Sequence, residues 1–380
     1  MVFEIVFWGS IFLIVYPYAV YPLLLLLWAG AFGRPVRRAD VEPTVTVLIP
    51  AYNEAGAIGA TLEAMLAQDY PPEMLEIVIV SDASDDGTDE IVAGFVGRGV
   101  ALLRQAQRGG KALALNAAVA RARGEIVVFA DANSRFAPTA VRSLACNFAD
   151  PSVGYVTGSL TLESHDRTVS GAGGSAYKGY EETLRLAETK VGSVIGVNGG
   201  CDAIRRELYS DIPRELITDF VLPLRVIAGG HRVVFDPEAR ATETANAELR
   251  SEFAMRVRVA LRALQGIVHM KSLLNPLRFP AVSFCLVSHK VLRYLAYLWL
   301  ISALLANVVL AVSSPLYRLL LVLHLGAYVL ALSGLRGGGG PGRRWSVVAA
   351  YVLMSYAAFA VASWRLLKGQ NMATWKPRAG

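Results

Sequence analysis

The feature that most constrains this chain is a short apolar run that ends in an acid. Residues 126–129 read Ile-Val-Val-Phe, and Asp131 and Asn133 follow almost directly. A run of β-branched and aromatic residues with polar residues at its end is typical of a buried strand. In an open α/β sheet, residues just beyond the carboxyl ends of the strands line the crevice where ligands bind. The run therefore predicts a sheet edge that carries a carboxylate.

Two similar runs occur upstream, at residues 45–49 and 76–80, and helical stretches separate the three runs. This alternation extends from residue 44 to about residue 241 and predicts an α/β domain with a mostly parallel sheet. Strands this continuously apolar are covered on both faces. The polar residues expected at the same edge as Asp131 are Asn53, Glu54, Ser81 and Asp82.

Other parts of the chain are too apolar for an ordinary soluble protein. Hydrophobic side chains make up 54% of the chain, and a bilayer-spanning helix needs about 20 apolar residues. Residues 5–33 meet that length without a charge, and the preceding Glu4, with no Lys or Arg, argues against a cleavable signal peptide. We expect this segment to be the first membrane helix, with three more at about 294–312, 316–335 and 347–367.

The orientation follows from the basic residues beside these segments. A basic collar at residues 34–38 places the α/β domain in the cytoplasm, and we expect a bacterial inner-membrane protein. Four crossings would put the C-terminus outside, whereas Lys368, Lys376 and Arg378 favour the cytoplasmic side. Either the tail is an exception to the rule, or residues 273–291 enter the membrane more deeply.

Residues 249–274 interleave arginines with apolar residues. This pattern predicts an amphipathic helix at the membrane surface, although a soluble core helix with a basic outer face fits nearly as well. The expected organisation is a transmembrane helix at 1–33, a cytosolic domain at 34–248, interfacial helices at 249–290, and transmembrane helices with a short tail at 291–380.

The charge balance and the cysteines exclude other classes of function. The chain has 37 Lys and Arg against 31 Asp and Glu, but these basic residues are scattered, which favours membrane lipid and diphosphate as partners over nucleic acid. Cys146, Cys201 and Cys285 lie far apart without the spacing of a metal or redox motif. We expect three reduced, packed thiols.

Two further motifs accompany Asp131. Gly110 and Lys111 precede it, and the sequence Thr-Asp-Phe-Val-Leu at 218–222 follows it. Motifs in this order resemble the family 2 glycosyltransferases, a group that includes the cellulose, hyaluronan and poly-N-acetylglucosamine synthases. The resemblance covers roughly residues 45–266. It implies a GT-A (Rossmann-like) domain and an enzyme that transfers a hexosyl or N-acetylhexosaminyl group from a nucleotide sugar, expected to be UDP-linked.

The resemblance also implies how the donor is held. The family's Asp-x-Asp motif binds Mg²⁺ or Mn²⁺ through its final carboxylate, and this chain has Asn133 there, a neutral and weaker ligand for a hard cation. We expect a divalent metal, Mg²⁺ or Mn²⁺, at Asp131 and Asn133. The residues expected to bind the nucleotide sugar are Ala51, Tyr52, Glu54, Asp82, Lys111, Asp131 and Arg258.

Asp219 matches the general base of the family's Thr-Glu-Asp-x-x-Leu motif. A simpler alternative is that it only caps a helix, and both can hold, because a helix N-terminus stabilises an ionised carboxylate. A glycine-rich segment before it resembles the family's acceptor-side segment, since glycines allow backbone to approach a ligand closely. The acceptor-side residues expected from it are Gly199, Gly200, Arg205 and Arg206.

The chain departs from the processive synthases at their Gln-x-x-Arg-Trp motif. Arg258 is retained, but Val259 replaces the tryptophan that stacks on the acceptor sugar. Together with the few membrane segments, this favours a single transfer to a lipid or lipid-linked acceptor over addition to a growing glycan. A catalytically silent nucleotide-sugar sensor is the alternative from another class. The sugar, the acceptor and the oligomeric state have no local signature.

Overall fold

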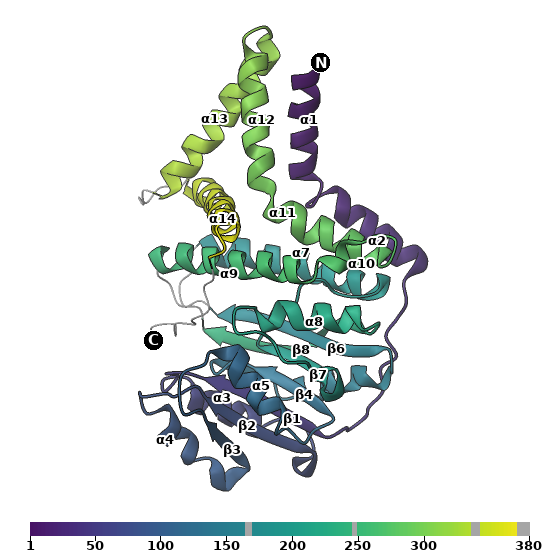
Figure 1. The fold of residues 1–380 in the computed structure, drawn as a ribbon, viewed down its shortest axis with the longest axis vertical. Coiled ribbons are helices and arrows are strands. Elements are labelled where there is room, and N and C mark those ends of the chain that lie inside the picture. The colour runs from purple at the N-terminus through teal and green to yellow at the C-terminus, as the bar shows by residue number, and fades with distance from the viewer. Residues whose placement is uncertain (164–168, 245–248, 336–342, 371–380) are drawn as a thin grey trace.

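The computed structural model describes residues 1–163, 169–244, 249–335 and 343–370. Figure 1 shows an α/β domain in its lower half and a group of helices in its upper half. Two long helices, α7 and α9, lie between the two parts.

The α/β domain is built on one eight-stranded sheet with strand order β3-β2-β1-β4-β7-β6-β8-β5. The first four strands in this order are parallel, and β7 pairs antiparallel with both β4 and β6. This sheet confirms the predicted α/β class with a mostly parallel sheet. The strands are β1 (Val45–Ala51), β2 (Leu75–Ser81), β3 (Val100–Arg104), β4 (Ile126–Ala130), β5 (Ser134–Phe136), β6 (Val153–Glu163), β7 (Cys201–Arg205) and β8 (Arg232–Thr244).

Helices cover both faces of the sheet, which explains why all seven residues of β1 are buried. Successive strand residues point to opposite faces, so Val47 and Leu48 enter different cores. One core contains residues of α3 and α6, and the other contains residues of α5, α7 and α8. These helices are α3 (Ile58–Leu66), α4 (Thr88–Ala93), α5 (Lys111–Val119), α6 (Ala140–Cys146), α7 (Val169–Val191) and α8 (Thr218–Ala228).

The segment expected to be the first membrane helix, residues 5–33, consists of two helices, α1 (Val2–Val15) and α2 (Val20–Phe32), which meet at 52° and together are long and apolar enough for one bent span. The break contains Pro17, which has no N–H to continue the helical hydrogen bonds. α2 packs against α7, and its Tyr21 and Leu25 are fully buried within the core of the α/β domain. The second half of the expected span, α2, therefore packs against the α/β domain.

The second expected span is also half of a bent pair. Residues 280–294 form α10 (Pro280–Leu286), a π-helical turn η6 (Val287–Val291) and α11 (Leu292–Tyr294), and α12 (Ala296–Ala311) leaves them at 59°. By length and composition, two described helices, α13 (Pro315–Leu335) and α14 (Arg343–Leu367), can each cross a membrane, or up to four spans exist if each bent pair counts as one.

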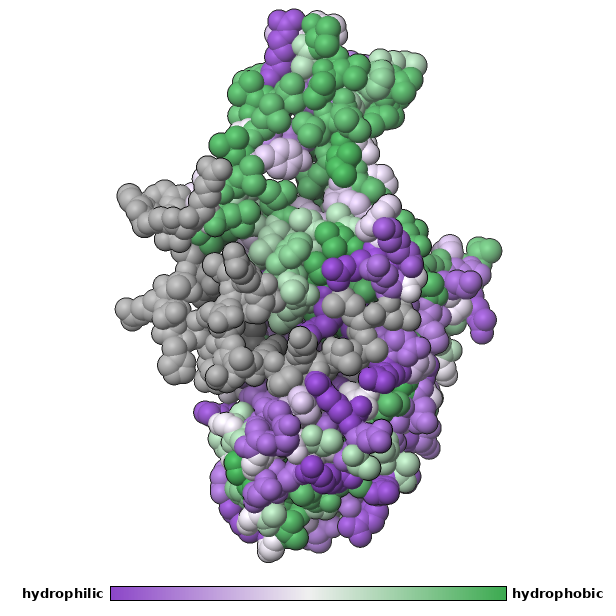
Figure 2. Space-filling view, turned by 60° about the vertical axis from the view of Figure 1, so that its left-hand side comes forward, coloured by the Kyte–Doolittle hydropathy of each residue, from purple (hydrophilic) through white to green (hydrophobic). Residues whose placement is uncertain are grey.

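Hydrophobic surface gathers over these upper helices in Figure 2, while the α/β domain below is largely hydrophilic. The basic residues expected in the tail at 376 and 378 lie outside the described residues. The side of the membrane on which the tail lies therefore stays a prediction.

Helix α9 (Leu249–His269) joins the two parts of the molecule. Its Arg256 donates a hydrogen bond to Ser355 of α14 at 2.7 Å, and Leu261 packs with Ala362 of the same helix. On the domain side, a Cβ on Gly266 would come within 2.6 Å of the Phe220 ring in α8. α9 therefore lies between the domain and the last membrane-type helix and contacts both.

Candidate active site

The expected site residues meet at the carboxyl edge of the sheet. Asp131 follows β4, Lys111 is the first residue of α5, and Asp219 lies in the first turn of α8. The Lys111 ammonium lies 2.6 Å from Asp131 Oδ1 and 3.6 Å from Asp219 Oδ2. Three residues from separate motifs thus form one ionic cluster, and each side chain is partly exposed at the edge.

The charge of Lys111 is fixed by its surroundings. Burial acts to lower the pKa of this lysine, but the carboxylates of Asp131 and Asp219 outweigh it and hold the pKa well above its ordinary value. Lys111 is therefore protonated at any physiological pH. The cluster offers a permanent positive charge between two acids, where a departing diphosphate could be neutralised.

Gly199 and Gly200 cross the middle of this cluster with left-handed backbone angles, φ +71° and +72°. A Cβ on Gly199 would come within 2.5 Å of Asp219 Oδ2, and one on Gly200 within 3.4 Å of Asp131 Oδ2. Any side chain here would displace an acid as well as strain the backbone. The structure therefore places both glycines beside Asp219, the expected general base, and Asp131, the expected metal ligand.

Asp82 does not face the open edge. Its two carboxylate oxygens accept the backbone N–H groups of Gly109 at 2.7 Å and Gly110 at 2.8 Å. These contacts hold the turn that begins α5 and thereby position Lys111. A direct contact between Asp82 and the nucleotide stays a prediction.

The loops after β1 and β2 form one rim. Asn53 donates to Asp85 Oδ1 at 2.8 Å and accepts from the Asp85 N–H at 3.1 Å, which ties the two loops together. The Arg108 guanidinium stacks 3.7 Å from the centre of the Tyr52 ring. Ala51 is buried at the end of β1, and the Glu54 N–H donates to Thr88. Arg108 was not expected, because its contact with Tyr52 arises only in the folded chain.

The structure places Arg205 and Arg206 away from this edge, contrary to expectation. In the antiparallel pairing of β4 and β7, Cys201 lies opposite Ala130 and Arg205 opposite Ile126, at the other end of the strand. Arg205 donates to the backbone carbonyls of Phe148, Asp150 and Val153, and Arg206 donates to the Gly124 carbonyl at 2.7 Å. Both guanidinium groups therefore stabilise this end of the sheet through hydrogen bonds to the backbone.

Helix α9 contributes arginines near Asp219. Burial lowers the pKa of Arg262, and the Asp219 carboxylate is close enough to act in the opposite direction. Arg262 also donates to the Leu216 carbonyl at 2.9 Å. Arg258 lies one turn earlier, and its charge also acts on Arg262. Arg262 was missed because no motif marks it, and the diphosphate contact expected of Arg258 stays a prediction.

A second acid missed by the sequence is Asp202 in β7, which is only 1% exposed. Burial, followed by the negative charge of Asp219, raises its pKa to about 7. Among the described residues, no donor has strict hydrogen-bond geometry to either carboxylate oxygen, although the Thr157 and Tyr155 hydroxyls face it. The site therefore contains a buried acid, two residues after Gly200, whose pKa is close to neutral pH.

The oxygen atoms at this edge fit a divalent cation. Glu243 of β8 and Ser134 of β5 lie opposite one another, and both approach the space that a Cβ on Gly200 would occupy, at 2.9 and 3.2 Å. Asp131 Oδ2 borders the same space. Among the described residues no three His, Cys, Asp or Glu side chains form a metal site. Hard oxygen donors of this kind suit Mg²⁺ or Mn²⁺.

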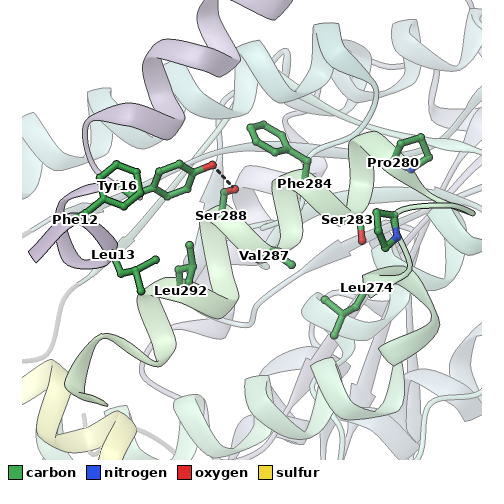
Figure 3. A pocket seen from close by; sticks show the side chains of 11 residues that line it. Phe12, Leu13, Tyr16, Leu274, Pro280, Ser283, Phe284, Val287, Ser288 and Leu292 are labelled. Carbon is green, nitrogen blue, oxygen red and sulfur yellow. Dashed lines mark hydrogen bonds between the residues drawn. The ribbon is translucent and has the colours of Figure 1, made fainter. Parts of the chain in front are cut away.

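A separate pocket lies away from this cluster, between α1 and the α10–η6 segment. Its volume is about 390 Å³, and most of its lining is apolar, as Figure 3 shows. The hydroxyl groups of Tyr16 and Ser288 form a hydrogen bond of 3.1 Å at its wall. None of the site residues named above lines this pocket.

Comparison with known proteins agrees with this geometry. Residues 46–212 match the model of glycosyl transferase family 2. An N-acetylglucosaminyltransferase of Rhizobium meliloti (strain 1021) is 26% identical over 80% of this chain and 78% of its own length. A poly-beta-1,6-N-acetyl-D-glucosamine synthase of Staphylococcus aureus (strain MSSA476) is 26% identical over 60% of this chain and 56% of its own length.

A solved structure covers almost the whole molecule. It is the mannosyltransferase PcManGT of Pyrobaculum calidifontis in complex with GDP-Man and Mn²⁺, which superposes with a TM-score of 0.70 and 26% identity over 95% of this chain and 98% of that one. The likeness includes the membrane-type helices as well as the α/β domain, because it extends over nearly all residues. The chain therefore carries a glycosyl transferase family 2 domain of GT-A fold, and it is a glycosyltransferase.

Proposed function

We propose that this enzyme is an inverting glycosyltransferase that transfers a sugar from a nucleotide sugar to a hydroxyl of a lipid or lipid-linked acceptor at the cytoplasmic face of a bacterial inner membrane. The observation that carries the proposal is the contact of Lys111 with Asp131 and Asp219 across the Gly199–Gly200 turn. This arrangement provides separate groups for the leaving diphosphate and for the attacking hydroxyl.

In the proposed reaction, Asp219 is the general base. Its Oδ1 accepts a hydrogen bond from the Thr218 hydroxyl at 3.0 Å, and it lies in the first turn of α8. Asp219 takes the acceptor proton while the acceptor oxygen attacks the anomeric carbon. The bond from that carbon to the phosphate oxygen breaks, and its electron pair leaves with the nucleoside diphosphate on the opposite face.

The departing negative charge requires fixed positive groups. Lys111 is the nearest, and we assign the same role to Arg258 and its neighbour Arg262 on α9. A divalent cation held by Asp131, with Asn133 beside it, would supply further charge neutralisation when bound. The solved mannosyltransferase contains Mn²⁺ together with its nucleotide sugar, which supports metal use here.

The donor we propose is UDP-linked, with Ala51, Tyr52, Glu54 and Asp82 on the nucleotide side. Two relatives whose names include N-acetylglucosamine support an N-acetylhexosamine donor. The mannosyltransferase with bound GDP-Man makes a guanosine-linked hexose the competing choice.

Three features support a lipid acceptor. The apolar helices α13 and α14 are suited to a membrane, α9 connects α14 to the catalytic domain, and the pocket beside α1 is apolar and of ligand size. Val259 lies on α9 with 50% of its surface exposed and offers no ring for stacking a glycan. The synthase name of the Staphylococcus relative supports processive synthesis as the alternative.

The decisive experiment is turnover of a panel of UDP- and GDP-sugars by detergent-purified protein with Mg²⁺ or Mn²⁺ and a membrane lipid extract, followed by product sizing. A short, lipid-soluble product from one donor supports the proposal and identifies the sugar. A long polymer would replace it with a processive synthase. Donor binding without transfer or slow hydrolysis would replace it with a nucleotide-sugar sensor.

A further inference from the structure

Glu243 is an acid outside every motif discussed so far. It lies near the end of β8 and is 5% exposed. The antiparallel pairing of β5 and β8 places it opposite Ser134, whose hydroxyl donates to Glu243 Oε1 at 2.5 Å. Ser134 directly follows Asn133, so the sheet register brings Glu243 beside the position where the family's second metal-binding acid would lie.

Gly200 shows that Glu243 and Asp131 approach one another. A Cβ built on this glycine would lie 2.9 Å from Glu243 Oε1 and 3.4 Å from Asp131 Oδ2. The two oxygens therefore face the same small space, which only the absence of a side chain keeps open. The other oxygen of Asp131 points to Lys111 at 2.6 Å, so the two sides of this carboxylate have different partners.

We propose that Glu243 supplies the second anionic ligand of the divalent cation, together with Asp131 Oδ2, in place of the carboxylate that Asn133 lacks. A divalent cation between two carboxylate oxygens that border the same space would lower their mutual repulsion, and Mg²⁺ and Mn²⁺ prefer anionic oxygen. The Ser134 hydroxyl borders the same space and holds Glu243 Oε1 in place through its hydrogen bond, as partners of metal-binding carboxylates do. This inference rests on the proposed metal-assisted transfer.

Manganese binding tests the proposal without relying on transfer. The bound fraction of Mn²⁺ is measured by electron paramagnetic resonance on the full-length protein, once with UDP and once with GDP. Glu243→Gln should weaken Mn²⁺ binding about 10-fold or more. Glu238→Gln is the matched control, because Glu238 lies on the same strand but is exposed and pairs with Arg38 at the surface.

The ranking of variants separates the two possible ligands. Asn133→Ala should weaken Mn²⁺ binding less than Glu243→Gln does, and Glu243→Asp should fall between Gln and the native residue. An unchanged affinity in folded Glu243→Gln, or a larger loss in Asn133→Ala, would overturn the proposal. A thermal melt confirms folding, and if Glu243→Gln does not fold, Glu243→Asp against Asn133→Ala decides the question.

The same measurements keep this inference separate from the proposed function. Loss of Mn²⁺ binding in Glu243→Gln supports the ligand assignment whether or not the native protein transfers a sugar. Native protein that transfers sugar yet binds no Mn²⁺ or Mg²⁺ at the millimolar concentrations used for turnover would refute the ligand assignment and leave the transferase intact.

Discussion

Two clusters of charged side chains in this molecule differ in how far they are exposed to solvent. At the sheet edge, Lys111 forms ion pairs with Asp131 and Asp219, and each of the three side chains keeps a quarter or more of its surface exposed. Between α7 and the π-helical turn, Glu188 contacts Tyr21 at 2.7 Å and His289 at 2.6 Å, and all three are fully or almost fully buried. One cluster is open to a ligand, and the other is closed.

The closed cluster extends further along α7. Glu181 contacts the other side of His289 at 3.2 Å and Arg293 at 2.6 Å, and Arg293 also donates to the Pro17 carbonyl. The cluster thus joins three parts of the chain: α2, α7 and the η6–α11 segment. Its acids are already satisfied by protein partners, whereas the acids at the sheet edge border a space kept free by glycine. The closed cluster therefore stabilises the fold, whereas the open cluster is accessible to a ligand.

The largest effect should come from the open cluster. Asp219→Asn removes the base and keeps the shape, so the transfer rate should fall about 10²- to 10⁴-fold while donor binding changes little. Single-turnover transfer and calorimetric binding of the nucleoside diphosphate measure the two effects. Native-like turnover in this variant would show that Asp219 only begins a helix.

Substitution in the closed cluster should affect stability instead. Glu188→Gln leaves His289 and Tyr21 without their buried charged partner, and breaking such a pair costs about 3–5 kcal/mol. A thermal melt in detergent measures this change, and donor affinity of the remaining folded protein should be unchanged. Glu90→Gln is the control, since Glu90 is exposed. Equal stability of both variants would contradict the division into open and closed clusters.

Asp202 is buried, like the closed cluster, but lies near Asp219 of the open cluster, and its titration should make stability depend on pH. Because burial, then Asp219, raises its pKa from 3.8 to about 7, the folded state holds a proton that the unfolded state has lost. The contribution of Asp202 to stability therefore falls as pH rises from about 4 to 7, by on the order of 4 kcal/mol. Lys111, Asp219 and Tyr155 are the other ionisable groups acting on it.

Asp202→Asn removes this proton dependence and should flatten the curve of melting temperature against pH. Melting at pH 5.5 and pH 8 in the native protein and the variant tests it. The variant should be the more stable protein at pH 8. A pH response identical to that of the native protein would place the titration on another group.

The smallest effect on catalysis should come from Arg205. Its guanidinium donates to three backbone carbonyls at the far end of the strand, so Arg205→Ala should lower stability by about 1.5–3 kcal/mol and leave the KM for the acceptor near its native value. Steady-state kinetics and a melt measure the two. A large rise in the acceptor KM would restore Arg205 to the acceptor side.

The sequence predicted those parts of the site that depend on where strands and helices begin and end. Lys111 and Asp131 could be placed together because the ends of neighbouring parallel strands and the helices that follow them meet at one edge. The same reasoning failed for Arg205. Strand β7 runs antiparallel to its neighbour, so the four residues after Cys201 carry the chain to the opposite edge.

Other residues could not be found from local patterns. Glu243 reaches the site through its register with Ser134, and Asp202 through its register with Phe129, which are properties of the assembled sheet. The bend between α1 and α2 was missed for a related reason. Hydropathy counts apolar residues, but it does not show whether Tyr21 and Leu25 meet lipid or the core of a neighbouring domain.

That contact of α2 with the domain has a practical consequence. An enzyme attached to a membrane by a flexible tether can be cut free, or moved to another anchor, and still fold. Here the segment expected to be the anchor supplies Tyr21 and Leu25 to the interior of the catalytic domain, and a main-chain hydrogen bond from Arg34 to Lys190 continues the attachment. Removal of the first 33 residues would expose that interior to solvent, so the domain and these residues should fold as one unit.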